Sequence, residues 1–354
     1  MKKFLRFILL IINVVFVVAL LLSTFAGGVP PSRFVWISIL SYGYFPLVLC
    51  NVVFIIIWLS MSRWEFLVST AAIAIRYSFL PLFFQVGGCT GVEKSEDSFK
   101  MMTFNTHSFV CETDTAITRD SAATLFLEIL DEEEPDAFCL QECFGAYKIN
   151  ISDSLIARGY KYHYGVQGSS VNAPLILYSK FAFVNVHDMD KKSKFYVDIN
   201  CFGKDIRICC VHLDSYQLDT ADLRDFERIS HAQIDDTSAH KLLGKFKETI
   251  RCHEKEWNEE LKPLIEKTSG PIIIAGDFND TPASYIYQQA TKLLKDPYVA
   301  QGRGFGTTYH GPYPAFRIDY LLHSPSLEAL SYKRVKTNIS DHYPIVVQFA
   351  LAHD

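Results

Sequence analysis

Six short segments of the sequence carry side chains that can bind a metal ion or move a proton. In each one, Asn, Asp, Glu or His comes at or next to one end of an apolar run typical of a buried strand. The segments are residues 104–107, 140–142, 211–215, 276–279, 317–320 and 340–344. A polar turn or a structural histidine explains any one of them, but six in one stretch of chain indicate a shared site.

The elements that must position these side chains are short strands that alternate with helices. Apolar runs predict strands at residues 101–105, 137–141, 175–178, 206–212, 272–276, 318–322 and 345–349. Residues 121–130 have helical spacing, and apolar positions within 219–268 mark a second helical face. This alternation predicts an α/β domain, and polar residues past its strand ends should meet at one edge.

The residue types of these motifs and their order along the chain resemble those of the endonuclease/exonuclease/phosphatase superfamily. The motifs are Phe104-Asn105, Gln141-Glu142, Val211-His212, Gly276-Asp277-Phe278-Asn279, Ile318-Asp319 and Ser340-Asp341-His342. The resemblance covers residues 99–350 and implies a four-layer, deoxyribonuclease-like fold in which two packed β-sheets are flanked by helices. Members of the superfamily include deoxyribonucleases, apurinic endonucleases, neutral sphingomyelinases and inositol-phosphate 5-phosphatases, so hydrolysis of a phosphate ester is the expected chemistry.

The resemblance implies metal ligands among the matched residues. Hydrolysis of a phosphate ester needs an oriented water, neutralised phosphoryl charge and a stabilised leaving oxygen. Glu142 and Asp341 match metal ligands, and Asn105 matches a residue that either binds the metal or orients Glu142; their oxygen atoms suit Mg²⁺, with Mn²⁺ as the alternative. One metal or two remains open. No role follows for neighbours of the motifs, which are His107, Tyr178, Asp214, His310 and Arg317.

The other matched residues correspond to the catalytic groups of the superfamily. Asp277 matches the residue that positions or deprotonates the attacking water, and Asn279 matches a contact to the phosphoryl oxygen. His342 matches the essential histidine, and Asp319 matches the carboxylate that fixes its tautomer. His212 matches a second histidine, which binds the phosphate and can protonate the leaving group.

Charge bears on the choice of substrate. Residues 97–354 hold 27 Lys or Arg and 36 Asp or Glu. Broad binding of nucleic acid depends on cations that neutralise phosphates, so this balance disfavours a processive nuclease. The cluster Lys191, Lys192 and Lys194 is typical of a solvated loop. A lipid head group, a nucleic acid degraded outside the cell and a small phosphodiester remain open as substrates, as does a non-catalytic module that binds a phosphate ligand.

The first 96 residues have a different composition, typical of a membrane region. Residues 7–29, 34–59 and 66–86 are apolar runs. A helix needs ~20 residues to cross a hydrocarbon core of ~30 Å. We therefore expect about three transmembrane helices in residues 1–96 and a catalytic domain in residues 97–354. A cleaved signal peptide is the alternative for the first run.

The charges that flank the runs predict the orientation in the membrane. Lys2, Lys3 and Arg6 precede the first run and Arg63 precedes the third, whereas Arg33 lies on the opposite side. The positive-inside rule then puts the N-terminus in the cytoplasm and the domain on the extracytoplasmic (periplasmic) side. A re-entrant third run would reverse this.

These features together predict a multi-pass integral membrane phosphodiesterase that uses metal-assisted in-line attack of water. No protein partner is predicted.

Overall fold

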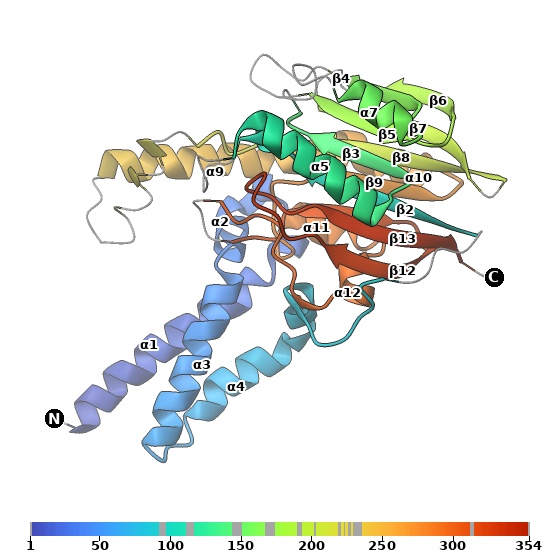
Figure 1. The fold of residues 1–354 in the computed structure, drawn as a ribbon. Helices are drawn as coiled ribbons and strands as arrows, with labels where there is room; N and C mark the ends of the chain where they lie inside the picture. Colours follow the sequence, from blue (N-terminus) through green and yellow to red (C-terminus); the bar gives the residue numbers. More distant parts are fainter. Residues whose placement is uncertain are drawn as a thin grey trace.

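The apolar runs after residue 97 form two β-sheets that pack face to face (Figure 1). The structure, a computed structural model, describes residues 2–91, 97–110, 117–143, 151–166, 174–189, 193–201, 203–218, 221–222, 224–225, 228, 236–311 and 315–352. Within these residues one sheet has the strand order β12 (Leu327–Arg334), β13 (Ile345–Leu351), β2 (Ser98–Asn105), β3 (Ala137–Gln141), β5 (Leu175–Ser179) and β4 (Tyr162–Val166). The other has the order β11 (Asp319–His323), β9 (Ile272–Asp277), β8 (Lys204–His212), β7 (Lys194–Cys201) and β6 (Phe183–Asp188). A two-residue strand, β1 (Phe84–Gln85), pairs with β10 (Gly304–Phe305).

Helices cover the outer faces of both sheets, which gives the expected order of four layers. The helices α5 (Arg119–Glu133) and α7 (Ser152–Ala157) pack on the six-stranded sheet. The π-helix at Trp257–Leu261, α10 (Lys262–Lys267) and α11 (Tyr285–Ala290) pack on the five-stranded sheet. Two further helices are α9 (Asp236–Glu256) and α12 (Pro297–Gln301). The seven predicted strands and the helix at residues 121–130 are all present.

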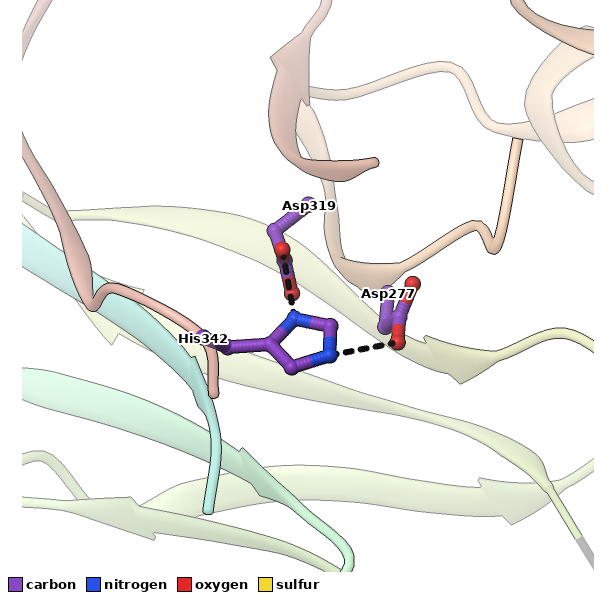
Figure 2. Close-up of side chains that lie close together, drawn as sticks. All are labelled: Asp277, Asp319 and His342. Atoms are coloured by element: carbon purple, nitrogen blue, oxygen red, sulfur yellow. Dashed lines mark hydrogen bonds and ion pairs between the residues drawn. The ribbon is translucent and has the colours of Figure 1, made fainter. Parts of the chain in front are cut away.

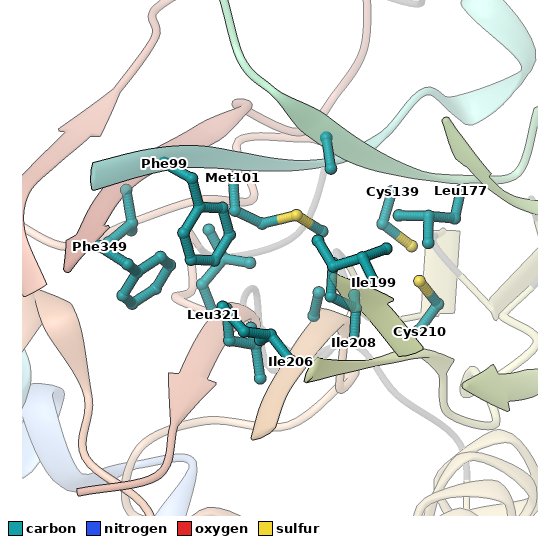
Figure 3. Packing of buried hydrophobic residues seen from close by; sticks show 14 of the residues in the cluster. Phe99, Met101, Cys139, Leu177, Ile199, Ile206, Ile208, Cys210, Leu321 and Phe349 are labelled. Carbon is teal, nitrogen blue, oxygen red and sulfur yellow. The ribbon is translucent and has the colours of Figure 1, made fainter. Parts of the chain in front are cut away.

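The unbroken apolar run of β2 reflects burial on both faces of its sheet. Successive side chains of a strand point to opposite faces. Phe99 and Met101 therefore point into the core between the sheets (Figure 3), while Met102 and Phe104 point into the layer that contains α5. Removing an apolar side chain of this size from water contributes about 2 kcal/mol. The core between the sheets is what holds the two halves of the domain at a fixed distance.

The register of the strands brings the polar ends together at one edge. The strands β2 and β3 are parallel, with Asn105 paired to Gln141. The strands β8 and β9 are also parallel, with His212 paired to Asp277. The antiparallel strand β11 begins at Asp319, directly beside Asp277. The carboxyl ends of two strands from each sheet therefore lie at a common edge.

The N-terminal region contains three helices that lie side by side and project from the domain (Figure 1). They are α1 (Lys2–Ser23), α3 (Tyr44–Ser60) and α4 (Phe66–Ile75). The short helix η1 (Ala26–Gly28) and α2 (Pro31–Ser41) connect α1 to α3 at the end nearest the domain, and η2 (Tyr77–Leu82) follows α4. The N-terminus lies at the far end of α1.

The structure does not confirm three full membrane spans. Among the described residues one helix, within residues 3–28, is long and apolar enough to cross a membrane. The pair α2 and α3, bent by 51°, adds at most one more. The third run gives only a 10-residue helix, because α4 ends at Arg76 and the chain continues as the 3₁₀ helix that contains Pro81. A helix of that length rises ~15 Å, about half of a hydrocarbon core.

The three helices pack through polar side chains and expose apolar ones. The Nε1 of Trp58 donates to Asn13 Oδ1 at 2.9 Å, and Asn13 Nδ2 donates to Ser69 Oγ at 2.6 Å. The Ser69 hydroxyl donates in turn to Asn51 Oδ1 at 2.8 Å. The outward-facing residues of α1 are large and apolar, among them Phe4, Leu5, Phe7, Val15 and Val18. Polar residues inside and apolar residues outside are typical of helices packed in lipid.

The prediction that Lys191, Lys192 and Lys194 lie in a solvated loop is wrong for Lys194. Lys194 is buried in β7, and its Nζ lies 2.6 Å from Glu256 Oε1 and 3.4 Å from Glu260 Oε2. A buried ammonium is stable only when it is paired in this way. Lys191 and Lys192 lie outside the described residues.

Gly276 provides a test of how closely β8 and β9 approach each other. Its φ is +148°, and a Cβ built there lies 1.8 Å from the carbonyl oxygen of Val211. We expect Gly276→Ala to lower the free energy of unfolding by about 3 kcal/mol or more, because the residue must adopt a strained conformation and push the neighbouring strand away. Urea unfolding of the full chain in detergent measures this.

A matched control is Gly244→Ala in α9, where a Cβ meets nothing within 4 Å. That substitution should raise the free energy of unfolding by about 0.5–1 kcal/mol, since alanine is the better helix former. Wild-type stability of Gly276→Ala would contradict the close pairing of the two strands.

Candidate active site

The predicted site residues meet at the common edge of the two sheets. Asn105 is the last residue of β2, and Glu142 follows β3 directly. His212 and Asp277 end β8 and β9, whereas Asp319 begins β11. Asp341 and His342 precede β13 by a few residues. The structure thus brings together side chains that are up to 237 positions apart, from Asn105 to His342.

Asp277 lies at the centre of this group and is almost fully buried, at 1% exposed. Its Oδ2 accepts from Asn105 Nδ2 at 3.0 Å, and its Oδ1 accepts from the backbone N–H of Asn279 at 2.7 Å. The Nε2 atoms of His212 and His342 lie 3.9 Å and 4.0 Å from the same Oδ2. Burial, with a further contribution from the charge of Asp319, raises the pKa of Asp277 to about 6.

His342 is held between two carboxylates (Figure 2). Its Nδ1 lies 2.9 Å from Asp319 Oδ2, and its Nε2 faces Asp277. Burial by itself would lower the pKa of His342, but the charge of Asp319 and the hydrogen bond to it outweigh burial and raise the pKa to about 10. The ring is therefore an imidazolium at neutral pH, with Nδ1–H donating to Asp319 and Nε2–H directed at Asp277.

Glu142 lies on the other side of Asn105 and makes longer contacts. Its Oε1 accepts from Asn105 Nδ2 at 3.3 Å and lies 3.5 Å from His212 Nε2. The Nδ1 of His107 lies 3.6 Å from Glu142 Oε2 and 3.8 Å from Asp341 Oδ1. Burial tends to raise the pKa of Glu142, but the hydrogen bond from His107 and the charges of the histidines prevail and lower it to about 2. The group is an ionised carboxylate at neutral pH.

The oxygen donors of the site fit a hard divalent cation. Glu142 and Asp341 have side chains that are 28% and 11% exposed and face a cavity, with Asn105 beside them. Carboxylate and amide oxygens are what Mg²⁺ binds in proteins. The Nε2 of His212 is buried and has no hydrogen-bond partner among the described residues. An orphaned polar atom at this place indicates that a ligand completes the site.

A second cluster with the spacing of metal ligands was not predicted as such. Ligand atoms of Asp277, Asp319 and His342 all lie within 4.8 Å of one another. Because the Nδ1 of His342 already pairs with Asp319, this cluster is first of all a chain of charge-assisted hydrogen bonds. It differs from the predicted ligand set of Asn105, Glu142 and Asp341.

His107 is the site residue to which sequence reasoning gave no role. It reaches Glu142 and Asp341 because His107, Ser108 and Phe109 have φ values of +42°, +57° and +55°. Three consecutive non-glycine residues in the left-handed region cost about 1–3 kcal/mol each, and such strain gathers at functional sites. Nothing in the local sequence marks it, since none of the three is glycine.

The other neighbours of the motifs have structural contacts. Arg317 is buried, donates to Asp296 Oδ2 at 2.6 Å and supports the start of β11. The ring of His310 stacks on Tyr343, and Tyr178 stacks on Phe138 in the α5 layer. The backbone carbonyl of Asp214 accepts from His253.

A buried network next to the site connects it to the N-terminal region. Asp280 follows the Asp277–Asn279 segment, and its Oδ1 accepts from the hydroxyl of Tyr42, which also contacts the hydroxyl of Tyr216. The two nitrogens of His253 lie 3.1 Å from Asp280 Oδ2 and 2.8 Å from the carbonyl of Asp214. Both partners are acceptors, so the ring carries two protons. The hydrogen bond and charge of Asp280 overcome burial and raise the pKa of His253 to about 9.

Two sequence families match different parts of the chain. Residues 254–342 match the Endonuclease/Exonuclease/phosphatase family, and this range includes Asp277, Asn279, Asp319, Asp341 and His342. Over these residues the α/β part of this chain is similar to that family, and its fold is similar to that of solved endonuclease/exonuclease/phosphatase-like structures. Residues 5–83 match a domain of unknown function, DUF8431, which corresponds to the N-terminal helices. No curated protein sequence matches the chain significantly.

Solved structures are similar to this domain at low sequence identity. The catalytic domain of human Nocturnin with bound sulfate is 20% identical, with a TM-score of 0.50 over 74% of this chain and 96% of that one. A family member from Beutenbergia cavernae is 16% identical, with a TM-score of 0.48 over 72% of each chain. One from Bacteroides thetaiotaomicron is 19% identical, with a TM-score of 0.47 over 73% of this chain and 99% of that one.

The network around His253 predicts a dependence of stability on pH. The pKa of His253 is about 9 in the folded protein and ordinarily 6.5, so its contribution is complete below pH 6.5 and is lost as the pH rises through 9. The difference corresponds to about 3 kcal/mol. Urea unfolding of wild type and His253→Gln between pH 6 and 9.5 should show a falling free energy that the variant lacks.

The matched control is His240→Gln, which changes an exposed histidine on the same helix. Its free energy of unfolding should fall with pH as steeply as that of wild type. A wild-type slope in His253→Gln would mean that the buried imidazolium does not contribute.

Proposed function

We propose that this protein is a membrane-anchored, divalent-metal-dependent hydrolase of phosphate esters, with a preference for phosphodiesters. The observation that carries this proposal is the placement of Asp277 between His212 and His342 at one end of a cavity lined also by Glu142 and Asp341. The family match over residues 254–342 supports it. Along the chain, the proposed division is a membrane region in residues 1–96 and a catalytic domain in residues 97–354.

Asp277 is the proposed acceptor of the proton from the attacking water. Its raised pKa of about 6 lies near neutral pH, which is where a general base both remains ionised and accepts a proton effectively. Water oxygen then bonds to phosphorus as the bond from phosphorus to the departing ester oxygen breaks. The Nδ1 contact of His342 to Asp319 keeps Nε2–H directed into the site, where it stabilises the phosphoryl charge.

His212 and Asn279 are the proposed phosphate contacts. The buried Nε2 of His212 makes no hydrogen bond to the described residues, although Glu142 Oε1 lies 3.5 Å away, and we assign it to the phosphate or to the departing oxygen. Asn279 Nδ2 donates to the carbonyl of Leu213 at 2.9 Å. An amide carries two N–H donors, so the second one remains for a phosphoryl oxygen.

Glu142, Asp341 and Asn105 are the residues that would hold Mg²⁺ or Mn²⁺. When bound there, the cation neutralises charge on the phosphoryl oxygens. The low pKa of Glu142 keeps this carboxylate ionised and ready to bind a cation across the physiological pH range. His107, which lies between the two carboxylates, is the proposed positioning residue for this pair.

Hydrolysis of bis(p-nitrophenyl) phosphate by the full chain in detergent tests the proposed chemistry. We expect turnover with Mg²⁺ or Mn²⁺, none with EDTA, and faster turnover of the diester than of p-nitrophenyl phosphate. Asp277→Asn and His342→Ala should each lower kcat about 100-fold or more, since each removes a group needed in the transition state.

Asp205→Asn is a matched control for these variants, because this exposed carboxylate lies at the opposite end of β8. It should keep wild-type kcat. A folded protein that binds metal but turns over neither ester nor nucleic acid would favour a module that only binds a phosphate ligand.

The proposed anchor is the unit formed by α1, α3 and α4. Its exposed surface is apolar, its interior contains Asn13, Asn51 and Ser69, and α1 has the length and composition of a span. In α1 the basic residues Lys3 and Arg6 lie at the N-terminal end, and the opposite end connects through η1 to α11 of the domain. If α1 crosses the bilayer, the domain that packs against η1 lies opposite the N-terminus, which requires α3 and α4 to cross as a pair or not at all.

Fractionation and protease protection test the anchor and its orientation. We expect the full chain to stay with membranes in alkaline carbonate, because the apolar surface of α1, α3 and α4 needs lipid. Protease added outside intact spheroplasts should cut the domain but spare an epitope placed before Lys2. Release by carbonate would contradict the anchor, and protection of the domain until lysis would contradict the orientation.

A further inference from the structure

The cavity of the site has two chemically different ends. It has a volume of about 710 Å³, which is in the usual range for a small-ligand site. Glu142, Asp277, Asp341 and His342 line one end. Apolar side chains dominate the walls beyond it, among them Ile39, Pro46, Leu242, Leu243, Phe246 and Phe316. A ligand that fills this space is polar at one end and apolar along the rest.

The apolar walls come from two separate parts of the chain. Leu242, Leu243 and Phe246 are spaced along one face of α9, whereas Ile39 and Pro46 flank the joint between α2 and α3. The N-terminal region therefore supplies one wall of a cavity whose polar end belongs to the catalytic domain.

Specific contacts hold the two walls in place. The backbone N–H and the hydroxyl of Ser32 in α2 donate to the carboxylate of Glu254 in α9, at 2.6 Å and 2.8 Å. The Lys247 ammonium of α9 lies 3.9 Å from the ring centre of Trp36 in α2. At the joint itself, Tyr42 donates to Asp280, three residues past Asp277. The joint is thereby tied to the catalytic segment, and the wall has a defined position relative to the phosphate end.

The charge of the cavity selects against a nucleic acid strand. Among the described residues that line it there is no Lys or Arg, and three carboxylates are present. A single-stranded nucleic acid needs a basic groove that follows its backbone as well as aromatic rings on which bases stack, and the described lining of this cavity has the rings but no Lys or Arg. A single phosphate group next to hydrocarbon needs neither.

We propose that the natural substrate is a phosphate ester of a membrane lipid. Its phosphate lies at the end of the cavity lined by Asp277, His342 and Glu142, and its hydrocarbon lies between the α2–α3 joint and α9. The joint is at the domain end of α3, so in an anchored molecule it lies at the membrane surface, from which a lipid enters without crossing water (Figure 1). Water adds to phosphorus and gives a proton to Asp277, the ester bond to the departing alcohol breaks, and that alcohol leaves with a proton from His212. The inference rests on the proposed function.

A series of alkyl p-nitrophenyl phosphates with methyl, butyl and octyl chains tests the apolar wall. The full chain is assayed in detergent with Mg²⁺, below the concentration at which the esters form micelles. Each buried methylene raises kcat/KM by up to about fourfold, because it leaves water for an apolar surface. We expect the octyl ester to exceed the methyl ester at least about tenfold.

Variants in the wall distinguish this inference from the proposed function. Leu243→Asp, which puts a charge in the wall, and Leu243→Trp, which fills the cavity, should both bring the octyl-to-methyl ratio close to one. Because one variant adds a charge and the other adds volume, the same loss of the ratio in both would not come from a folding defect in only one of them. Ile156→Asp, on the exposed face of α7, should keep the wild-type ratio.

If wild type hydrolyses the methyl ester and its octyl-to-methyl ratio of kcat/KM is close to one, the inference is overturned and the proposed function remains. No metal-dependent hydrolysis of any ester would overturn the proposed function itself. The last assay compares hydrolysis of two kinds of substrate by the full chain. These are vesicles of phosphatidylglycerol or phosphatidylcholine and a single-stranded oligonucleotide. Release of a head group or phosphate from the vesicles supports a lipid substrate, whereas faster cleavage of the oligonucleotide contradicts it.

Discussion

A carboxylate buried to 1% exposure is costly unless its neighbours compensate, and Asp277 is such a group. Its compensation comes from both sheets, since Asn105 donates from β2 while the backbone of Asn279 donates from the segment after β9. The contact between Asn105 and Asp277 therefore joins the edges of the two sheets, whose separation is set by the core between them. Glu142 and His212 come close to this contact because β3 pairs with β2 and β8 pairs with β9, and His342 lies just before β13, which pairs with the other side of β2.

The parts of the fold that the sequence predicts are those with strong local signals. The strands β3 and β9 and the C-terminal halves of β2 and β8 are buried and largely apolar because both of their faces are covered, so their polar ends stand out as motifs. The strands β6 and β7 lack this signal, since β6 is half exposed and β7 contains Lys194, whose burial depends on Glu256, 62 residues away. The third apolar run was overestimated because hydropathy ignores the break at Arg76 and Pro81.

The site residues were predictable to the extent that they belong to motifs. Asn105, Glu142, His212, Asp277 and His342 could be named because each follows or precedes a strand, and the structure places them within contact of one another. Tyr42 and His253 could not be named, because their importance comes only from meeting at Asp280. Their sequence separation from Asp280, 238 and 27 residues, leaves no periodic or local trace.

The tie between Tyr42 and Asp280 also bears on how the molecule matures. Residues 39–46 leave the ribosome long before β9, so the joint between α2 and α3 exists before the segment that will pack against it. The catalytic edge is then completed on a wall that is already in place. Proteolytic release of the domain would remove that wall and uncover the apolar face of α9, so a shed fragment would be an aggregation-prone remnant and not a soluble form of the same enzyme.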